Sequence, residues 1–201
     1  MKTYLNIILF LAGIQLINAQ VQDGTLDING SPNFAQSITT MEAGLDDVEL
    51  ISSNTDPLVS FILNPTTNPI TGVTTSSELN CETVYLYKVF LHTVNAPQGA
   101  IVKAKTFDNS GQRFPLVSNY DTLLPILQYF GPRNLTAETN GADADGFITI
   151  PNDASQAIKV FEFKGCRQDI PVEFRVSPNV FTPSGSSIFQ VYYTITAQPF
   201  S

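Results

Sequence analysis

The last third of the chain alternates between apolar and polar side chains with a period of two residues. Segments 170–176 and 188–197 both follow this pattern, in the second segment from Phe189 onward. The apolar positions are Ile170, Val172, Phe174 and Val176 in the first segment, and Phe189, Val191, Tyr193, Ile195 and Ala197 in the second. Successive side chains of a β-strand point to opposite faces of a sheet. The pattern therefore predicts two strands, each with one face on a hydrophobic core and the other in water.

Shorter apolar runs between turn residues predict further strands. These are residues 47–51, 58–63, 83–94, 100–106, 147–150 and 157–164. Segment 83–94 is apolar on both faces, which predicts a central strand. Residues 64–77 are expected to form a loop, and residues 121–130 one or two helical turns or a covering loop. Many short strands without β–α alternation predict an all-β antiparallel sandwich, immunoglobulin-like in topology, with a jelly roll as the alternative.

The N-terminus has the anatomy of a cleavable signal peptide over residues 1–19. Lys2 precedes an apolar run at residues 5–17, and Ala19 supplies a small residue at the expected cleavage site. That run is too short and interrupted for a membrane span of about 20 residues, so no membrane insertion is expected. Residues 20–33 are expected to form a flexible arm or an edge strand. Residues 34–201 are expected to form a single β-sandwich domain.

The charge balance restricts the partners of the chain. It has 18 acidic residues against 10 Lys and Arg, and a formal net charge of −8 at pH 7. This charge repels phosphate backbones, which argues against nucleic acid as a partner. Together with the signal peptide, it predicts a secreted protein in the extracellular space or on the cell surface, with the periplasm as the alternative.

The chain has two cysteines, Cys81 and Cys166. In the oxidising compartment that a signal peptide implies, two cysteines by default form one disulfide. A zinc site is disfavoured, because two cysteines and the one histidine cannot complete four ligands without carboxylates.

Residues 140–148 (NGADADGFI) are similar to a calcium-binding loop. Asp143 and Asp145 alternate ahead of Gly146, an arrangement that lets carboxylates converge while the chain turns. The match is partial, because Gly141 stands where the first aspartate belongs and Asn152 where the bidentate glutamate belongs. Two interpretations are open, a calcium site at Asp143 and Asp145 or an acidic turn before a strand. No other cofactor is expected.

Aromatic residues supply a candidate binding surface. Tyr85, Tyr87, Tyr192 and Tyr193 lie in predicted strands, and tyrosines exposed on a sheet face can contact a protein or a glycan. The alternative is that these rings pack within the sheets. A catalytic site is not predicted, because the lone His92 has no nucleophile motif such as Gly-x-Ser-x-Gly beside it.

The final hairpin resembles that of secreted immunoglobulin-like pilin and spore-coat-U-type subunits. The resemblance covers the strand IPVEFRV, a turn with Pro183 and Gly185, and the strand FQVYYTITA. The signal peptide, with Ala19-Gln20 at its expected cleavage site, is similar to those of Bacteroidota. The resemblance implies a surface or fibre subunit.

Three functions follow as hypotheses. The first is a non-enzymatic protein of cell-surface structure or adhesion that contacts another protein or a copy of itself. The second is an extracellular module that binds a glycan or another ligand, assisted by calcium at Asp143 and Asp145. The third is a hydrolase of a type without a recognisable signature.

Overall fold

The computed structural model of the protein describes residues 23–35, 51–52, 57–82, 85–107, 110–116 and 141–199. The signal peptide expected at residues 1–19 and the segment 121–130 lie outside these residues.

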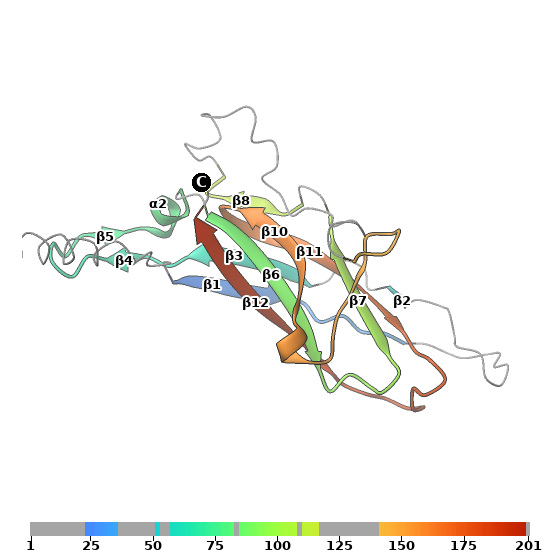
Figure 1. Ribbon diagram of the computed structural model, residues 1–201. Helices are drawn as coiled ribbons and strands as arrows, with labels where there is room; N and C mark the ends of the chain where they lie inside the picture. The colour runs from blue at the N-terminus through green and yellow to red at the C-terminus, as the bar shows by residue number, and fades with distance from the viewer. Residues whose placement is uncertain are drawn as a thin grey trace, which may run out of the picture.

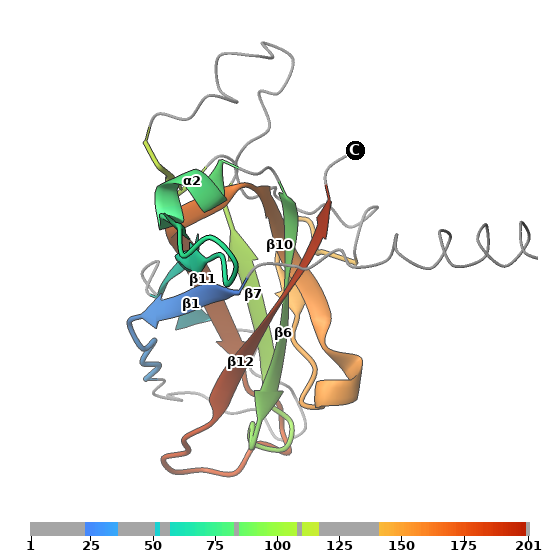
Figure 2. The ribbon, with the colours of Figure 1, turned by 90° about the vertical axis from the view of Figure 1, so that its left-hand side faces the viewer.

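Two antiparallel sheets pack together in the structure (Figures 1 and 2). The larger sheet consists of β1 (Gly24–Asn29), β2 (Ile51–Ser52), β3 (Leu58–Leu63), β7 (Ile101–Thr106), β8 (Gln112–Phe114), β9 (Ile148–Thr149) and β11 (Cys166–Ser177). Its order is β1-β3-β11-β7-β9, and β2 and β8 also pair with β11. The smaller sheet has β6 (Tyr85–Val94) between β10 (Ile158–Lys164) and β12 (Gln190–Pro199). The predicted antiparallel β-sandwich is thereby confirmed at the level of fold class.

A small hairpin and two short helical turns complete the described structure. The hairpin pairs β4 (Thr66–Thr67) with β5 (Thr74–Thr75), and the helical turns are α2 (Ser77–Cys81) and a 3₁₀ turn at Ala154–Gln156. Figure 1 shows the hairpin projecting from one end of the sandwich. The expected loop at residues 64–77 thus contains a hairpin. The Thr-rich sequence of this segment does not predict a hairpin, because the segment lacks alternation of apolar and polar residues.

The core lies between the two sheets and follows the period of two. In β3, Val59, Phe61 and Leu63 are buried while the residues between them are partly exposed. β11 alternates in the same way, as the sequence predicts, and β6 also alternates between buried and partly exposed residues although its sequence is apolar on both faces. In β10 both Val160 and Phe161 are buried, since the pairing with β6 shifts register between Lys159 and Phe161.

Strand β11 lies at the centre of the larger sheet and pairs along both of its edges. On one side it pairs with β3 near its start and with β2 near its end. On the other side it pairs with β8 near its start and with β7 over its second half. Arg167 of β11 is buried and donates hydrogen bonds to the carbonyl oxygens of Ser110 and Gly111, which lie between β7 and β8. This side chain therefore bridges the break between those two strands.

The predicted disulfide joins Cys81 at the end of α2 to Cys166 at the start of β11. The two Cα atoms are 5.4 Å apart, and both cysteines are fully buried. The backbone N–H of Leu63 lies 3.3 Å from Sγ of Cys81 and 3.4 Å from Sγ of Cys166. The disulfide thus ties the segment that carries the hairpin to the central strand of the larger sheet.

The N-terminal segment expected as an arm or an edge strand contains β1, which pairs with β3 through six residues. Its pattern of burial shows a strand that lies on the edge of the sheet, with only Leu26 packed against the core.

Replacement of both cysteines by serine is expected to lower the free energy of unfolding by about 4–5 kcal/mol, because the crosslink closes a loop of about 85 residues in the unfolded chain. For a domain of this size the melting temperature should fall by roughly 10–20 °C, which circular dichroism can measure. The variant Ser76→Ala is the control, since Ser76 caps α2 by accepting from Leu79 and its loss loosens only that turn. Equal melting temperatures for all three proteins would contradict the assigned role of the disulfide.

Candidate functional site

The most distinctive surface of the described structure is the outer edge of β12. β12 pairs with β6 over ten residues, from Gln190 opposite Val94 to Pro199 opposite Tyr85. No other described strand pairs with β12, so its second edge carries backbone N–H and C=O groups without partners from the described strands. An edge of this length is a template for pairing with a further strand.

The residues of β12 carry none of the usual protection of a sheet edge. Charged side chains, above all lysine, and bulges or prolines within the strand normally keep edges from pairing with other chains. No residue between Arg175 and the end of the chain is charged, and Pro199 is the final residue of β12. The pairing of β12 with β6 runs without a register shift. The edge is therefore long, regular and uncharged.

The inward side chains of β12 are only half-buried, although they pack against the core. The apolar residues on this face are Phe189, Val191, Tyr193, Ile195 and Ala197. On the neighbouring β6, by contrast, Val89 and Leu91 are 0 % exposed. Coverage of the core thus decreases from β6 to β12.

Tyr193 holds an unused hydrogen-bond donor. Its hydroxyl is buried and has no hydrogen-bond partner among the described residues. Burial raises the pKa of Tyr193 above its ordinary value, so the hydroxyl stays protonated at neutral pH. A buried hydroxyl without a partner costs free energy, and an acceptor brought in by a partner would remove that cost.

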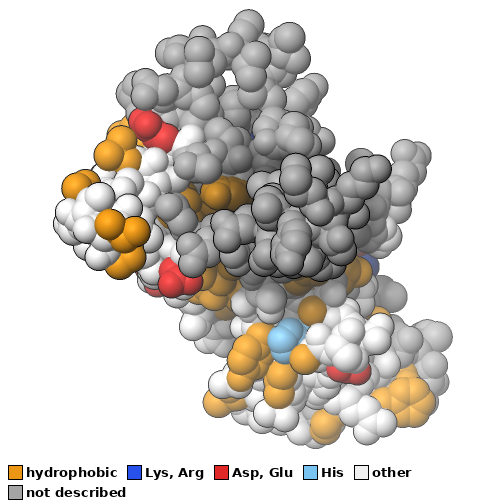
Figure 3. Space-filling model, turned by 60° about the vertical axis from the view of Figure 1, so that its left-hand side comes forward, with side chains coloured by type: hydrophobic (Ala, Val, Ile, Leu, Met, Phe, Trp, Pro, Cys, Tyr) orange, Lys and Arg blue, Asp and Glu red, His pale blue; other side chains and the backbone are white. Residues whose placement is uncertain are grey.

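The single histidine of the chain lies on the outer face of the smaller sheet. The His92 ring stacks on that of Tyr192, with centroids 5.1 Å apart and an angle of 11° between the rings. The two residues are directly opposite each other in the pairing of β6 with β12. Figure 3, in which histidine is pale blue, shows this residue at the surface with hydrophobic side chains around it.

The four tyrosines of the predicted binding surface do not share one face. Tyr87 is 1 % exposed and packs in the core against Phe61, with ring centroids 4.6 Å apart. Tyr193 points inward, and Tyr85 is partly buried near Tyr87. Tyr192 alone of the four is exposed, at 46 %. Side chains alternate between the two faces along β6 and β12, so tyrosines that are close in the sequence do not have to lie on the same face.

Asp143 and Asp145 lie in a turn that is held against the larger sheet. Oδ1 of Asp143 accepts hydrogen bonds from the backbone N–H groups of Asp145 and Phe147, at 3.1 and 2.9 Å. Oδ2 of Asp143 lies 2.8 Å from Nζ of Lys103, and Oδ2 of Asp145 lies 2.9 Å from Nη1 of Arg175. A calcium ion at these carboxylates would have to compete with both cations.

Strands β7 and β11, which carry Lys103 and Arg175, also hold Phe147 in place. Cζ of Arg175 lies 3.8 Å from the Phe147 ring centroid and Nζ of Lys105 lies 4.4 Å from it. Phe147 is 1 % exposed. Cation–π contacts therefore hold the turn against the larger sheet in addition to the ion pairs.

Burial raises the pKa of Asp143, but the hydrogen bonds from Lys103 and from the N–H of Phe147 outweigh it. The pKa of Asp143 therefore lies below its ordinary value of 3.8.

Within the described residues, no group of three or more His, Cys, Asp and Glu side chains is close enough to hold a metal ion together. None of the helices in the described part has the length and apolar character needed to cross a membrane.

A scan against protein-family models, a search of curated proteins and a search of solved structures found no match to this chain. The inference of function therefore starts from the geometry of the chain itself.

The variant Asp143→Asn is expected to lower the free energy of unfolding by about 1 kcal/mol at pH 7, because it removes a charge-assisted bond that is partly exposed to solvent. The lowered pKa of Asp143 means that its contribution is present above about pH 4 and is lost as the pH falls through the folded-state pKa. The difference from wild type should therefore shrink in acid, as measured by thermal unfolding over a pH series.

The matched control is Asp145→Asn, whose side chain is 65 % exposed beside Arg175. This variant should have the smaller effect. A difference for Asp143→Asn that stays constant down to about pH 2 would contradict the role assigned to the carboxylate.

Proposed function

We propose that this chain is a secreted, non-enzymatic β-sandwich protein of cell-surface structure or adhesion, a subunit that pairs with a further strand along the edge of β12 that no described strand occupies. The observation that carries the proposal is the long, regular and uncharged edge. Strand addition at such an edge supplies main-chain hydrogen bonds for affinity and side-chain contacts for specificity.

The order of the strands supports an immunoglobulin-like topology within this proposal. Such domains place strands A, B, E and D in one sheet and C, F and G in the other. Here β1-β3-β11-β7 corresponds to A-B-E-D by chain order, and β6-β12 corresponds to C-F, with β9 and β10 as additions before β11. The position of strand G falls at the second edge of β12, where none of the described strands pairs. A partner strand at that edge would complete the arrangement.

The proposed location is the cell surface or the extracellular space. The buried disulfide between Cys81 and Cys166 fits an oxidising compartment, and the features of residues 1–19 fit export.

The double variant Thr194→Lys/Thr196→Lys tests this proposal, since both side chains are exposed on β12 and lysine protects a natural edge. The wild-type protein is expected to assemble with itself or with a surface partner, and the variant to lose about tenfold or more in affinity. Sedimentation velocity measures self-assembly, and fractionation of producing cells measures surface retention.

Thr149→Lys is the matched control, because it adds the same charge at an exposed position of the other sheet and should leave assembly intact. A wild-type protein that stays monomeric at all concentrations and leaves no trace on cell surfaces would refute the proposal.

Glycan binding is the second candidate, and the exposed Tyr192 ring stacked on His92 is the observation that favours it. Aromatic rings exposed on a sheet face are a common surface for partners. Tyr192→Ala should abolish binding on a glycan array, and Asp145→Ala or a chelator should weaken it if calcium assists. Absence of glycan binding by the wild-type protein would eliminate this candidate.

A further inference from the structure

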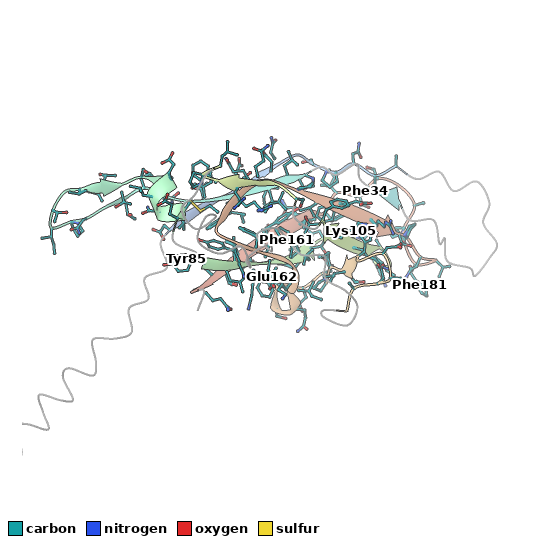
Figure 4. The ribbon with its side chains drawn as sticks, turned by 90° about the horizontal axis from the view of Figure 1, so that it is seen from above. Phe34, Tyr85, Lys105, Phe161, Glu162 and Phe181 are labelled. Carbon is teal, nitrogen blue, oxygen red and sulfur yellow. A yellow bond between two sulfur atoms is a disulfide. The ribbon has the colours of Figure 1, made fainter. Side chains whose placement is uncertain are left out.

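The exposed apolar side chains gather at the two ends of the sandwich. Ten large apolar side chains are exposed among the described residues, and eight of them lie at an end. Those at the hairpin end are Ile70, Val73, Leu79 and Leu116, and those at the opposite end are Ile101, Val180, Phe181 and Ile188. Figures 1 and 4 show the two ends far apart, with Phe181 labelled opposite the hairpin. Apolar surface that is concentrated in this way marks an interaction site.

At the hairpin end, hydrogen bonds hold the apolar tip in one conformation. The side chain of Asn68 accepts from the backbone N–H of Ile70 at 2.8 Å, and its carbonyl accepts from Gly72 at 2.9 Å. Asn80, which lies next to the disulfide, donates to the carbonyl of Asn64 at 2.6 Å and so anchors the base of the hairpin. Ile70 is 92 % exposed on this ordered tip. An anchor residue that is already ordered loses little conformational entropy when it binds.

At the opposite end, the loop between β11 and β12 lies against the turn between β6 and β7. A Cβ atom at Gly99 would lie 2.0 Å from the side-chain oxygen of Asn179, so the two loops approach as closely as backbone and side chain allow. The N–H of Asn179 donates to Thr182, and the Asn179 side chain accepts from the N–H of Phe181. These contacts present Phe181, 71 % exposed, at the end of the molecule.

In a chain with a net charge of −8, the β4–β5 hairpin and both loops of the opposite end carry no charged side chain, although Glu78 of α2 lies next to Leu79 at the hairpin end. Residues 57–77, 89–102 and 176–201 contain no Asp, Glu, Lys or Arg, and these segments include the hairpin and both loops of the opposite end. Two copies of an acidic chain repel each other least where the surfaces that meet are neutral.

We propose that the β4–β5 hairpin tip of one copy binds the β11–β12 loop end of a second copy, so that copies join end to end. The two surfaces differ and lie on opposite ends, so the contact is heterologous. A pair of bound copies still has one free tip and one free loop end. A heterologous contact that does not close into a ring generates an open chain of copies. The contact deepens the proposed function by naming a second copy as partner, and it uses residues separate from the β12 edge.

The test uses the edge variant Thr194→Lys/Thr196→Lys as parent, so that the end contact is measured alone. Into this parent, Ile70→Asp and Ile188→Asp are introduced separately. Both side chains are about nine-tenths exposed, so unfolding temperatures should not change. Thr149→Asp is the control, because it adds the same charge at an exposed position of β9 that belongs to neither apolar end.

Sedimentation equilibrium over a concentration series gives the expected results. The average mass of the parent and of the control rises with concentration, and each Ile→Asp variant associates about 30-fold or more weakly. An equimolar mixture of the two variants forms two-chain species and nothing larger, because one intact tip then meets one intact loop end.

Two results would overturn the end-to-end contact. A parent that stays monomeric at every concentration removes it, while leaving the β12 edge as the explanation of any wild-type assembly. Association of Ile188→Asp alone at parental strength would show that tips bind each other or a different surface. A different result would contradict the edge proposal. In that case the variant Thr194→Lys/Thr196→Lys would assemble as strongly as the wild-type protein.

Discussion

The larger sheet depends on the pairing of β11, through which its other strands are connected directly or by one neighbour. β11 is long enough to pair with two strands in succession on each side, so breaks in the outer strands do not divide the sheet. The buried Arg167 side chain satisfies backbone carbonyls at one of these breaks, and a buried guanidinium is tolerable only with such acceptors. Cys166, one residue before it, extends the constraint through the disulfide to α2 and the hairpin.

Charge is distributed unevenly over the described structure. On the larger sheet, ion pairs and cation–π contacts connect the turn near Phe147 to β7 and β11. From residue 176 onward the chain has no charged side chain, and this stretch includes the loop and the strand that end the sandwich. Neutral loops and a neutral edge accept neighbours more readily than charged ones, because no charge must be desolvated or repelled. The uneven distribution is the common physical basis of both proposed contacts.

Much of the fold could be predicted from local pattern. The expected strands at 58–63, 83–94, 100–106 and 157–164 agree with β3, β6, β7 and β10 to within two residues at each end. The central position of β6 followed from its apolar character on both faces. The hairpin at residues 64–77 could not be predicted, since its stability comes from Asn68 and from anchoring by Asn80, and neither contact leaves a periodic signal. The alternation of residues 188–197 predicted that Tyr193 faces the core and Tyr192 does not, and the structure agrees. The faces of Tyr85 and Tyr87 could not be predicted in this way, because segment 83–94 is apolar on both faces.

The sequence by itself determined the class of fold, the disulfide partners and the alternation of β12, because these depend on residue type and on the period of two. Only the tertiary structure decided that β12 lies at an edge, that its outer backbone is unpaired by the described strands, and that the exposed apolar residues lie at opposite ends. Alternation specifies which side chains face the core. An edge strand and a central strand show the same alternation when one face of the sheet is exposed to solvent, so the pattern does not tell them apart. The position of a strand depends on contacts between residues far apart in the chain, such as those of β12 with β6, and local sequence does not encode them.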